Sequence, residues 1–194
     1  YTKFLNMKDR ATAVLFSDGA VASIFGRVES GGIEDIFLGS NGAIADSIMI
    51  PCGGSRTPIT DGEGSLIQQI HMDGKVIRDF AYKVFPESIN TILHRNSLTL
   101  EDIDIVVAHQ PNPVLLRRLA ERMNIPNEKI IITGEDVGNI GCACTPYALA
   151  RASSQKRIFS GSKILVASFG AGMTWGSALI KWNGAPSVHI SSSP

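Results

Sequence analysis

Three stretches of the chain carry apolar residues at the three- and four-residue spacing of an amphipathic helix. They run from Gly74 to about His94, from Pro113 to Met123 and from Thr145 to Ser154. Pro86 lies inside the first stretch, and because proline has no amide hydrogen and crowds the preceding turn, it predicts a kink or a break there. The spacing Thr99-x-x-Asp102 predicts the start of a further, shorter helix.

Between these helices lie short apolar runs that are typical of strands. Residues 103–108, 130–132 and 164–168 are almost entirely apolar, as expected of buried strands, and residues 175–182 predict the last strand. Two runs near the start, at residues 11–16 and 21–28, predict a hairpin or one kinked strand around a turn at residues 17–20. Because strands alternate with helices, the pattern predicts an α/β protein with a largely parallel or mixed sheet.

Composition agrees with a folded domain and narrows the class of function. Hydrophobic residues make up 44% of the 194 residues and charged residues 19%, which is too apolar for a disordered chain. The 18 Lys and Arg balance the 18 Asp and Glu, so no chain-wide basic field for nucleic acid is expected. No apolar run approaches the roughly 20 residues that span a bilayer. The three cysteines and four histidines predict neither a disulfide scaffold nor a metal site, because their spacings fit neither.

The first candidate for chemistry is His109, which directly follows the apolar run that ends at Ala108. In α/β folds, sites form at the carboxyl ends of strands. An imidazole there can give or take a proton near neutral pH. Position alone equally allows a loop histidine that bonds to a nearby carbonyl.

Two segments rich in glycine are the other candidates. Asn139 lies in Val137-Gly138-Asn139-Ile140-Gly141, where it can adopt a left-handed turn or donate its amide hydrogens to a substrate oxygen. Residues 169–177 form a loop of small residues, whose backbone N–H groups can approach a ligand and stabilise an oxyanion. A tight β-turn would need the same glycines, so the loop alone does not decide between the two.

Taken in order, these segments resemble a known family. The motifs are His109-Gln110-x-Asn112, then Gly138-Asn139, then Phe169-Gly-x-Gly-x-Thr174-Trp175-Gly176-Ser177. Together they resemble the carboxy-terminal half of β-ketoacyl-acyl-carrier-protein synthase III, a family of thiolase-like condensing enzymes. The resemblance extends to Asp9-Arg10, Phe16-Ser17-Asp18-Gly19-Ala20 and Met72-x-Gly74, and it covers residues 9–182.

The resemblance implies a thiolase-like layered fold, in which helices flank a mixed β-sheet. Such enzymes consist of two similar halves. Residues 1–30 are expected to hold the terminal strands of the first half, residues 31–65 a connection that lines the site, and residues 66–182 the second half. Residues 183–194 are expected to form a flexible tail. The chain is therefore expected to be incomplete, a proteolytic fragment, or one component of a split complex.

The resemblance also implies a mechanism and its residues. In the family, a cysteine carries an acyl group as a thioester, while a histidine and an asparagine hold the thioester carbonyl of malonyl-acyl carrier protein. Loss of carbon dioxide leaves an enolate that attacks the acyl-cysteine. His109 and Asn139 match that pair, which acts through two neutral hydrogen-bond donors. Ala171, where the family usually has glycine, matches a backbone N–H of the oxyanion hole.

Further positions are implied to bind substrate. Phe169 is implied to form a wall of the acyl pocket, and Arg10 to contact the adenine and phosphate end of coenzyme A. The pantetheine channel is implied to pass Gly74, Pro111 and Asn112. No cofactor is implied, since acyl-coenzyme A is a substrate. The other implications are acyl carrier protein as a partner, a homodimer of the complete enzyme, and a cytoplasmic location.

The acidic carrier protein leads us to expect a basic surface near the channel. The candidates are Arg78, Lys83, Arg117, Arg118 and Arg122, and each can instead belong to an ordinary solvated helix face.

The chain also departs from the family. The nucleophilic cysteine of the family lies upstream of the position of Arg10, so nothing here matches it. Cys142 and Cys144 lie where a helix amino terminus can lower the pKa of a thiol, although the family has small packing residues at those positions. Ile140-Gly141 replaces the Thr-Ser that follows the asparagine in the family, and the lost hydroxyls can alter the site or the acyl group accepted.

Three functions therefore stay open at this stage. The first is decarboxylative Claisen condensation, which would make the protein an acyltransferase. The second is acyl transfer to an oxygen or nitrogen nucleophile in specialised metabolism, with His109 as general base. The third is a non-catalytic subunit, suggested by the missing nucleophile.

Overall fold

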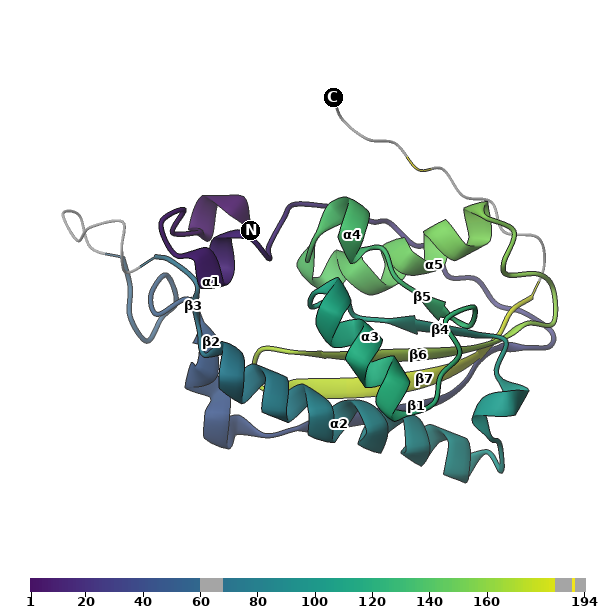
Figure 1. Cartoon of the computed structure of the whole chain (residues 1–194). Helices are drawn as coiled ribbons and strands as arrows, with labels where there is room; N and C mark the ends of the chain where they lie inside the picture. Colours follow the sequence, from purple (N-terminus) through teal and green to yellow (C-terminus); the bar gives the residue numbers. More distant parts are fainter. Residues whose placement is uncertain (60–67, 184–189, 191–194) are drawn as a thin grey trace.

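A mixed five-stranded sheet forms the centre of the computed structural model, which describes residues 1–59, 68–183 and 190. Its strands are β1 (Gly32–Ser40), β4 (Ile105–Ala108), β5 (Ile130–Ile131), β6 (Lys163–Gly170) and β7 (Thr174–Lys181). They lie in the order β1-β7-β6-β4-β5 (Figure 1). β4 is parallel to β5 and β6, whereas β7 is antiparallel to β6 and β1. The predicted α/β class with a mixed sheet is confirmed.

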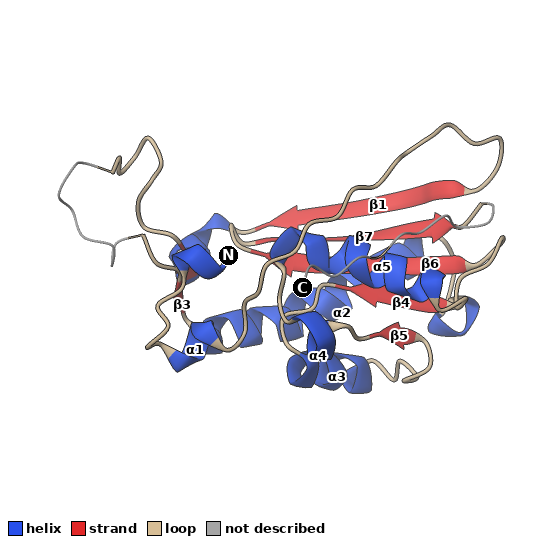
Figure 2. Ribbon diagram, turned by 90° about the horizontal axis from the view of Figure 1, so that it is seen from above, coloured by secondary structure: helices blue, strands red, loops and turns tan. Residues whose placement is uncertain are grey.

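Helices cover the two faces of this sheet. The helices are α1 (Arg10–Ala13), α2 (Gly74–Arg95), α3 (Pro113–Arg122), α4 (Gly134–Val137) and α5 (Cys144–Ser154). On one face, α2 and α3 bury a continuous apolar core with β4, β6 and β7, to which Phe85, Leu116 and Leu165 contribute. On the other face, Ala148 and Ala152 of α5 pack against β4, β5 and β6. Figure 2 shows β1 at the edge of the sheet.

A two-stranded ribbon joins this sheet to the start of α2. It pairs β2 (Ile48–Met49) with β3 (His71–Met72). After β3, the carboxylate of Asp73 accepts hydrogen bonds from the N–H groups of Lys75 and Val76 and so caps α2. The ribbon and the first turn of α2 are thereby held at the end of the sheet where His109 follows β4.

Two sequence-based predictions, one at Pro86 within α2 and one at Thr99 after it, compare differently with the structure. Of the kink or break predicted at Pro86, the break is wrong, because α2 is one helix from Gly74 to Arg95. Phe85 and Ile89, on either side of the proline, are fully buried against the sheet, and this burial outweighs one missing backbone hydrogen bond. The predicted start of a short helix at Thr99 is confirmed as a 3₁₀ turn at Leu100–Asp102, where the Thr99 N–H and hydroxyl both donate to Asp102.

The strands predicted at residues 11–16 and 21–28 are wrong. Asp9 caps a helical turn instead, since its carboxylate accepts from the N–H of Ala11. Residues 21–28 form neither helix nor strand, and Ile24 and Phe25 are 101% and 79% exposed. A strand needs a neighbour for its backbone groups, and none of the described strands pairs with this segment. The terminal strands expected within residues 1–30 are therefore not formed.

The other expected boundaries remain predictions. Part of the connection at 31–65 and most of the tail at 183–194 lie outside the described residues. Within the part of the chain that is described, each helix is too short or too polar to cross a membrane.

Candidate active site

Two cavities meet around His109. The larger has a volume of about 730 Å³ and is bounded by β6, β7, residues 48–50 and the segment that begins at Asn139. The smaller, of about 310 Å³, lies toward the first turns of α2 and α3. His109, Asn139, Phe169 and Ala171 line both cavities. Four of the predicted site residues, from three segments far apart in the chain, therefore lie at the junction where two ligands can meet.

His109 is held at the end of β4 as a neutral imidazole. Its backbone N–H donates to the carbonyl of Ala167 at 2.9 Å, which continues the pairing of β4 with β6. Its ring lies edge-on to that of Phe169, with the ring centroids 5.4 Å apart. Burial lowers the pKa of His109 to about 4, because the charged form would lose its hydration. At neutral pH the side chain is an uncharged hydrogen-bond donor and acceptor.

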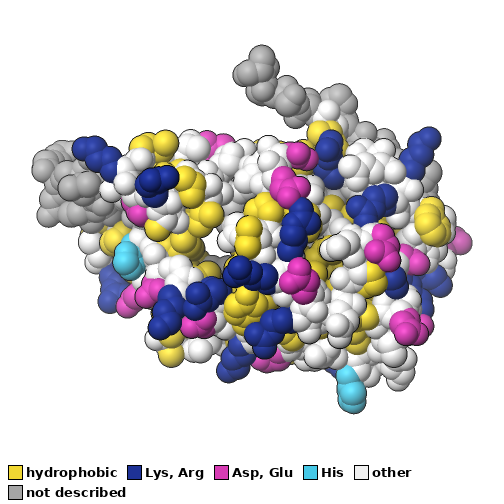
Figure 3. Space-filling model, in the orientation of Figure 1, with side chains coloured by type: hydrophobic (Ala, Val, Ile, Leu, Met, Phe, Trp, Pro, Cys, Tyr) yellow, Lys and Arg dark blue, Asp and Glu magenta, His cyan; other side chains and the backbone are white. Residues whose placement is uncertain are grey.

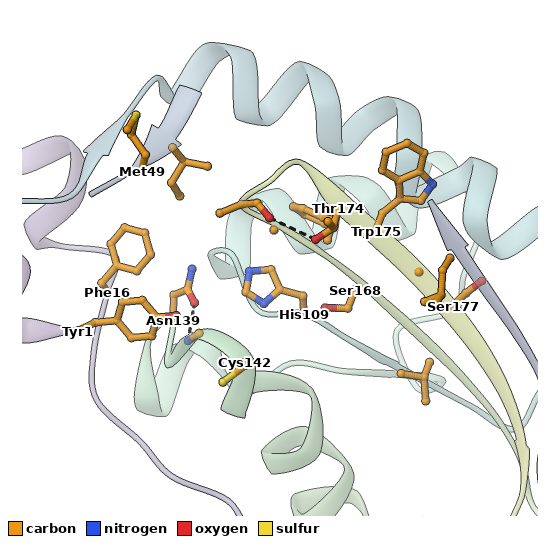
Figure 4. Close-up of a pocket in the computed structure, with 18 of the residues that line it drawn as sticks. Tyr1, Phe16, Met49, His109, Asn139, Cys142, Ser168, Thr174, Trp175 and Ser177 are labelled. Carbon is orange, nitrogen blue, oxygen red and sulfur yellow. Dashed lines mark hydrogen bonds between the residues drawn. The ribbon is translucent and has the colours of Figure 1, made fainter. Parts of the chain in front are cut away.

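Asn139 lies beside His109 and faces the same cavity (Figure 4). Its backbone N–H donates to the carbonyl of Leu15 at 2.8 Å, and its carbonyl accepts from the N–H of Ser17 at 2.9 Å. Its side-chain oxygen accepts from the N–H of Gly141 at 2.9 Å. Since that bond occupies the oxygen, the amide nitrogen is the atom that the residue presents to the cavity.

Gln110 joins the segments after β4 and β5, although its place in the sequence predicted no role beyond membership of a motif. Its amide nitrogen donates to the carbonyls of Ala108 and Ile131, each at 2.9 Å. Its side-chain oxygen accepts from the N–H groups of Thr133 and Gly134, at 2.9 and 3.2 Å. One buried side chain thus ties together the ends of β4 and β5 and the start of α4. The signal in the sequence was a polar residue directly after a buried strand.

The end of β6 and the loop after it complete the junction. Phe169 is buried between the rings of His109 and Phe80, edge-on to both. Ala171 is exposed at the tip, where its carbonyl accepts from the Thr174 hydroxyl at 3.2 Å. Phe169 separates the cavities from the core, and Ala171 brings a backbone segment to the mouth that both cavities share.

The smaller cavity is lined by all three residues that were predicted for the pantetheine channel. Gly74, Pro111 and Asn112 line it, and a Cβ added at Gly74 would meet open space. Asn112 also caps α3, because its side-chain oxygen accepts from the N–H of Leu115 at 2.8 Å. Because this bond uses the oxygen, the amide hydrogens of Asn112 are the groups that can bind a ligand. Arg10 is not brought to either cavity; it is exposed at the start of α1, next to a residue that lines the smaller one.

The basic candidates divide into two groups. Arg78 and Arg118 line the smaller cavity, and Lys and Arg side chains gather over α2 and α3 in Figure 3. Lys83, Arg117 and Arg122 do not line it. Arg117 pairs with Glu135, and Arg122 lies over the ring of Tyr82, 5.0 Å from its centroid. Two of the five predicted basic residues therefore border the site.

The two cysteines after Asn139 have different surroundings. Cys142 is exposed and lines the larger cavity (Figure 4). Cys144 is buried, and this burial raises the pKa of its thiol. The alternative in which the helix start lowers the pKa of the thiol is therefore wrong for Cys144, because the loss of hydration outweighs the backbone hydrogen bonds that act in the opposite direction.

The arrangement of strands and helices is the thiolase-like fold. The structure resembles the β-ketoacyl-acyl-carrier-protein synthase III of Thermus thermophilus, with a TM-score of 0.79 and 32% identity over 94% of this chain and 56% of that one. The corresponding enzyme of Aquifex aeolicus matches with a TM-score of 0.81 and 28% identity, over 93% of this chain and 54% of that one.

Sequence comparisons agree with the structural ones. Residues 93–182 match the model of the carboxy-terminal region of 3-oxoacyl-[acyl-carrier-protein] synthase III, and residues 1–42 match the second model of that enzyme. The β-ketoacyl-[acyl-carrier-protein] synthase III of Caldanaerobacter subterraneus is 39% identical over 94% of this chain, and that of Clostridioides difficile is 35% identical over 93%. The chain belongs to the β-ketoacyl-acyl-carrier-protein synthase III family. It spans 56% of the length of each of these two relatives.

Proposed function

We propose that this chain supplies the enolate-stabilising part of an enzyme that joins an acyl thioester to malonyl-acyl carrier protein by decarboxylative Claisen condensation. The observation that carries the proposal is the placement of a neutral His109 beside the amide of Asn139, at the junction of two cavities. Membership of the condensing-enzyme family supports it.

The proposed chemistry follows from these two donors. The thioester carbonyl of the malonyl group accepts hydrogen bonds from the His109 ring and the Asn139 amide. When carbon dioxide leaves, the electron pair of the broken bond moves toward that oxygen, and both bonds strengthen as negative charge develops. Uncharged donors already held in a buried site need no reorganisation as the charge forms. The resulting carbanion carbon then attacks the acyl-thioester carbonyl, and the cysteine thiolate leaves.

The two cavities suit the two substrates. The smaller, lined by Gly74, Pro111 and Asn112, is proposed to take the pantetheine arm of the carrier protein or of acyl-coenzyme A. The larger has a mostly apolar lining and is proposed to take the acyl group with the cysteine that carries it. This chain has no residue matching that cysteine, so a further polypeptide segment is required to provide it. Ala171 is proposed to donate its N–H to the acyl-thioester oxygen.

Partners follow from the same proposal. The carrier protein, named in the relatives, is proposed to dock beside Arg78 and Arg118 at the mouth of the smaller cavity. We propose a homodimeric, cytoplasmic enzyme, as the family resemblance implies. Acyl transfer to an oxygen nucleophile is less well supported, because an imidazole whose pKa is about 4 is a weak base toward a hydroxyl group.

The test is decarboxylation of malonyl-acyl carrier protein by the protein as it occurs in the cell, together with the segment that carries the cysteine. We expect His109→Ala and Asn139→Asp each to lower the decarboxylation rate about 10²- to 10³-fold, as for loss of an oxyanion donor. Asn139→Asp keeps the side-chain oxygen that accepts from the Gly141 N–H, but it replaces the amide nitrogen, which is the donor, by a second carboxylate oxygen that cannot donate. His94→Ala, at an exposed histidine on α2, is the matched control. Unchanged decarboxylation in His109→Ala would overturn the proposal.

A further inference from the structure

The Asn139 carboxamide can act as a donor only in one of two orientations. A rotation of 180° about its last side-chain bond exchanges oxygen and nitrogen with almost no change in shape. Hydrogen bonds therefore decide which atom faces the cavity. The N–H of Gly141, which donates to the oxygen at 2.9 Å, is one such bond.

The thiol of Cys144 makes a second contact to the same oxygen. Its sulfur lies 3.5 Å from the Asn139 side-chain oxygen and 3.9 Å from the carbonyl oxygen of Gln110, the residue after His109. Cys144 is 0% exposed, so water does not compete for the thiol hydrogen. In the reversed orientation, the amide hydrogens of Asn139 would face both the N–H of Gly141 and the thiol hydrogen.

We infer that Cys144 is a positioning residue, whose single thiol hydrogen, donated to the nearer of its two acceptors, holds the Asn139 carboxamide with its nitrogen toward the cavity. The effect on catalysis rests on the proposed function. The orientation itself does not, because it follows from the hydrogen bonds alone. The raised pKa of Cys144 means that the thiol keeps its proton, and so its donor, at neutral pH.

Two substitutions separate donation from packing. Cys144→Ala removes the donor, and Cys144→Ser keeps one on a smaller side chain. Ser153→Ala is the matched control, because Ser153 is buried on the same helix and its hydroxyl has no hydrogen-bond partner in the described part of the chain. Each variant is made in the protein as it occurs in the cell, and its thermal midpoint shows that it is folded.

Two readouts are needed. The first is the side-chain amide signal of Asn139 in ¹⁵N–¹H NMR spectra, assigned by its loss in Asn139→Asp. The second is kcat and KM for decarboxylation of malonyl-acyl carrier protein. We expect Cys144→Ala to shift or broaden the signal, and to lower kcat about tenfold with KM within about twofold, the effect of one weak hydrogen bond. Cys144→Ser is expected to retain the Asn139 signal and most of kcat. Ser153→Ala is expected to leave the Asn139 signal and kcat unchanged.

The outcomes distinguish the two proposals. An Asn139 signal that is unchanged in Cys144→Ala overturns the inference, even when decarboxylation proceeds and the proposed function stands. If Cys144→Ser and Cys144→Ala change the signal and kcat equally, Cys144 acts through packing, and this result also overturns the inference. The Asn139 signal can also change in Cys144→Ala but not in Cys144→Ser while the protein does not decarboxylate malonyl thioester. This result supports the positioning of Asn139 and rejects the proposed function.

Discussion

At the scale of single residues, burial determines how His109 can act. A solvent-exposed imidazole would be partly charged near neutral pH, whereas the buried ring has a pKa of about 4 and stays neutral. Phe169, which lies edge-on to the ring, contributes to this apolar surrounding. A neutral ring can donate to a developing enolate without first losing the hydration shell of an ion.

The same burial predicts how stability depends on pH. The unfolded chain binds a proton on His109 below about pH 6.5, and the folded protein only below about pH 4. Stability is therefore full above pH 6.5 and decreases as the pH falls through this window, by on the order of 3 kcal/mol from this residue. We expect the free energy of unfolding, measured with urea at pH 7.5 and 5, to fall by less in His109→Gln than in the unmodified protein. An equal fall in both would contradict the buried, neutral imidazole.

Site residues were predictable from the sequence where position along an element determines them. His109 was a candidate because it follows a buried strand, whereas Gly74 and Asn112, which lie at helix starts, were implied only by the family resemblance. Arg10 was assigned by the family resemblance alone; it lies at the start of α1, outside both cavities, and its role stays a prediction. The bonds of Gln110 and the contacts of Cys144 join segments far apart in the chain, so no local pattern reveals them.

At the scale of elements, tertiary burial overrides local propensity. The length and apolar face of α2 were predictable from spacing, because both halves of the helix pack on one sheet. A kink or a break at Pro86 was predicted from local chemistry alone, and the break did not form. The strands expected at residues 11–16 and 21–28 did not form although their local sequence favours strands. No described strand lies beside them to complete their hydrogen bonds.

Pro86 therefore costs α2 stability that a substitution can restore. Pro86→Ala gives position 86 an amide hydrogen that can bond to the carbonyl of Tyr82. We expect the free energy of unfolding to rise by about 1–3 kcal/mol, as for a proline removed from a helix interior. Lys83→Ala, at an exposed position of the same helix, is the control and should change it by less than about 0.5 kcal/mol. A loss of stability in Pro86→Ala would instead show that α2 needs the proline to fit the sheet.

At the scale of the whole molecule, the two faces of the sheet are covered unequally. α2 packs across β1, β6 and β7 on one face, whereas α5 lies over β4, β5 and β6 on the other. On that second face, Ile36 and Leu38 of β1 are 51% and 76% exposed, and both line the larger cavity. The chain spans 56% of the length of two relatives, and the proposed function requires a cysteine-bearing segment at this cavity. That segment is therefore expected to cover β1.

The surface of β1 can be tested with one charge. Leu38→Lys replaces an apolar side chain by one that loses hydration on burial, so we expect this chain to bind the cysteine-bearing segment at least about 10-fold more weakly. Titration calorimetry between the separately produced parts measures this. Phe159→Lys, an equivalent change at an exposed apolar residue outside both cavities, is the control. Equal weakening by both would indicate a nonspecific charge effect. Unchanged binding of Leu38→Lys would mean that the segment packs elsewhere, and that the larger cavity is not closed by the part that carries the nucleophile.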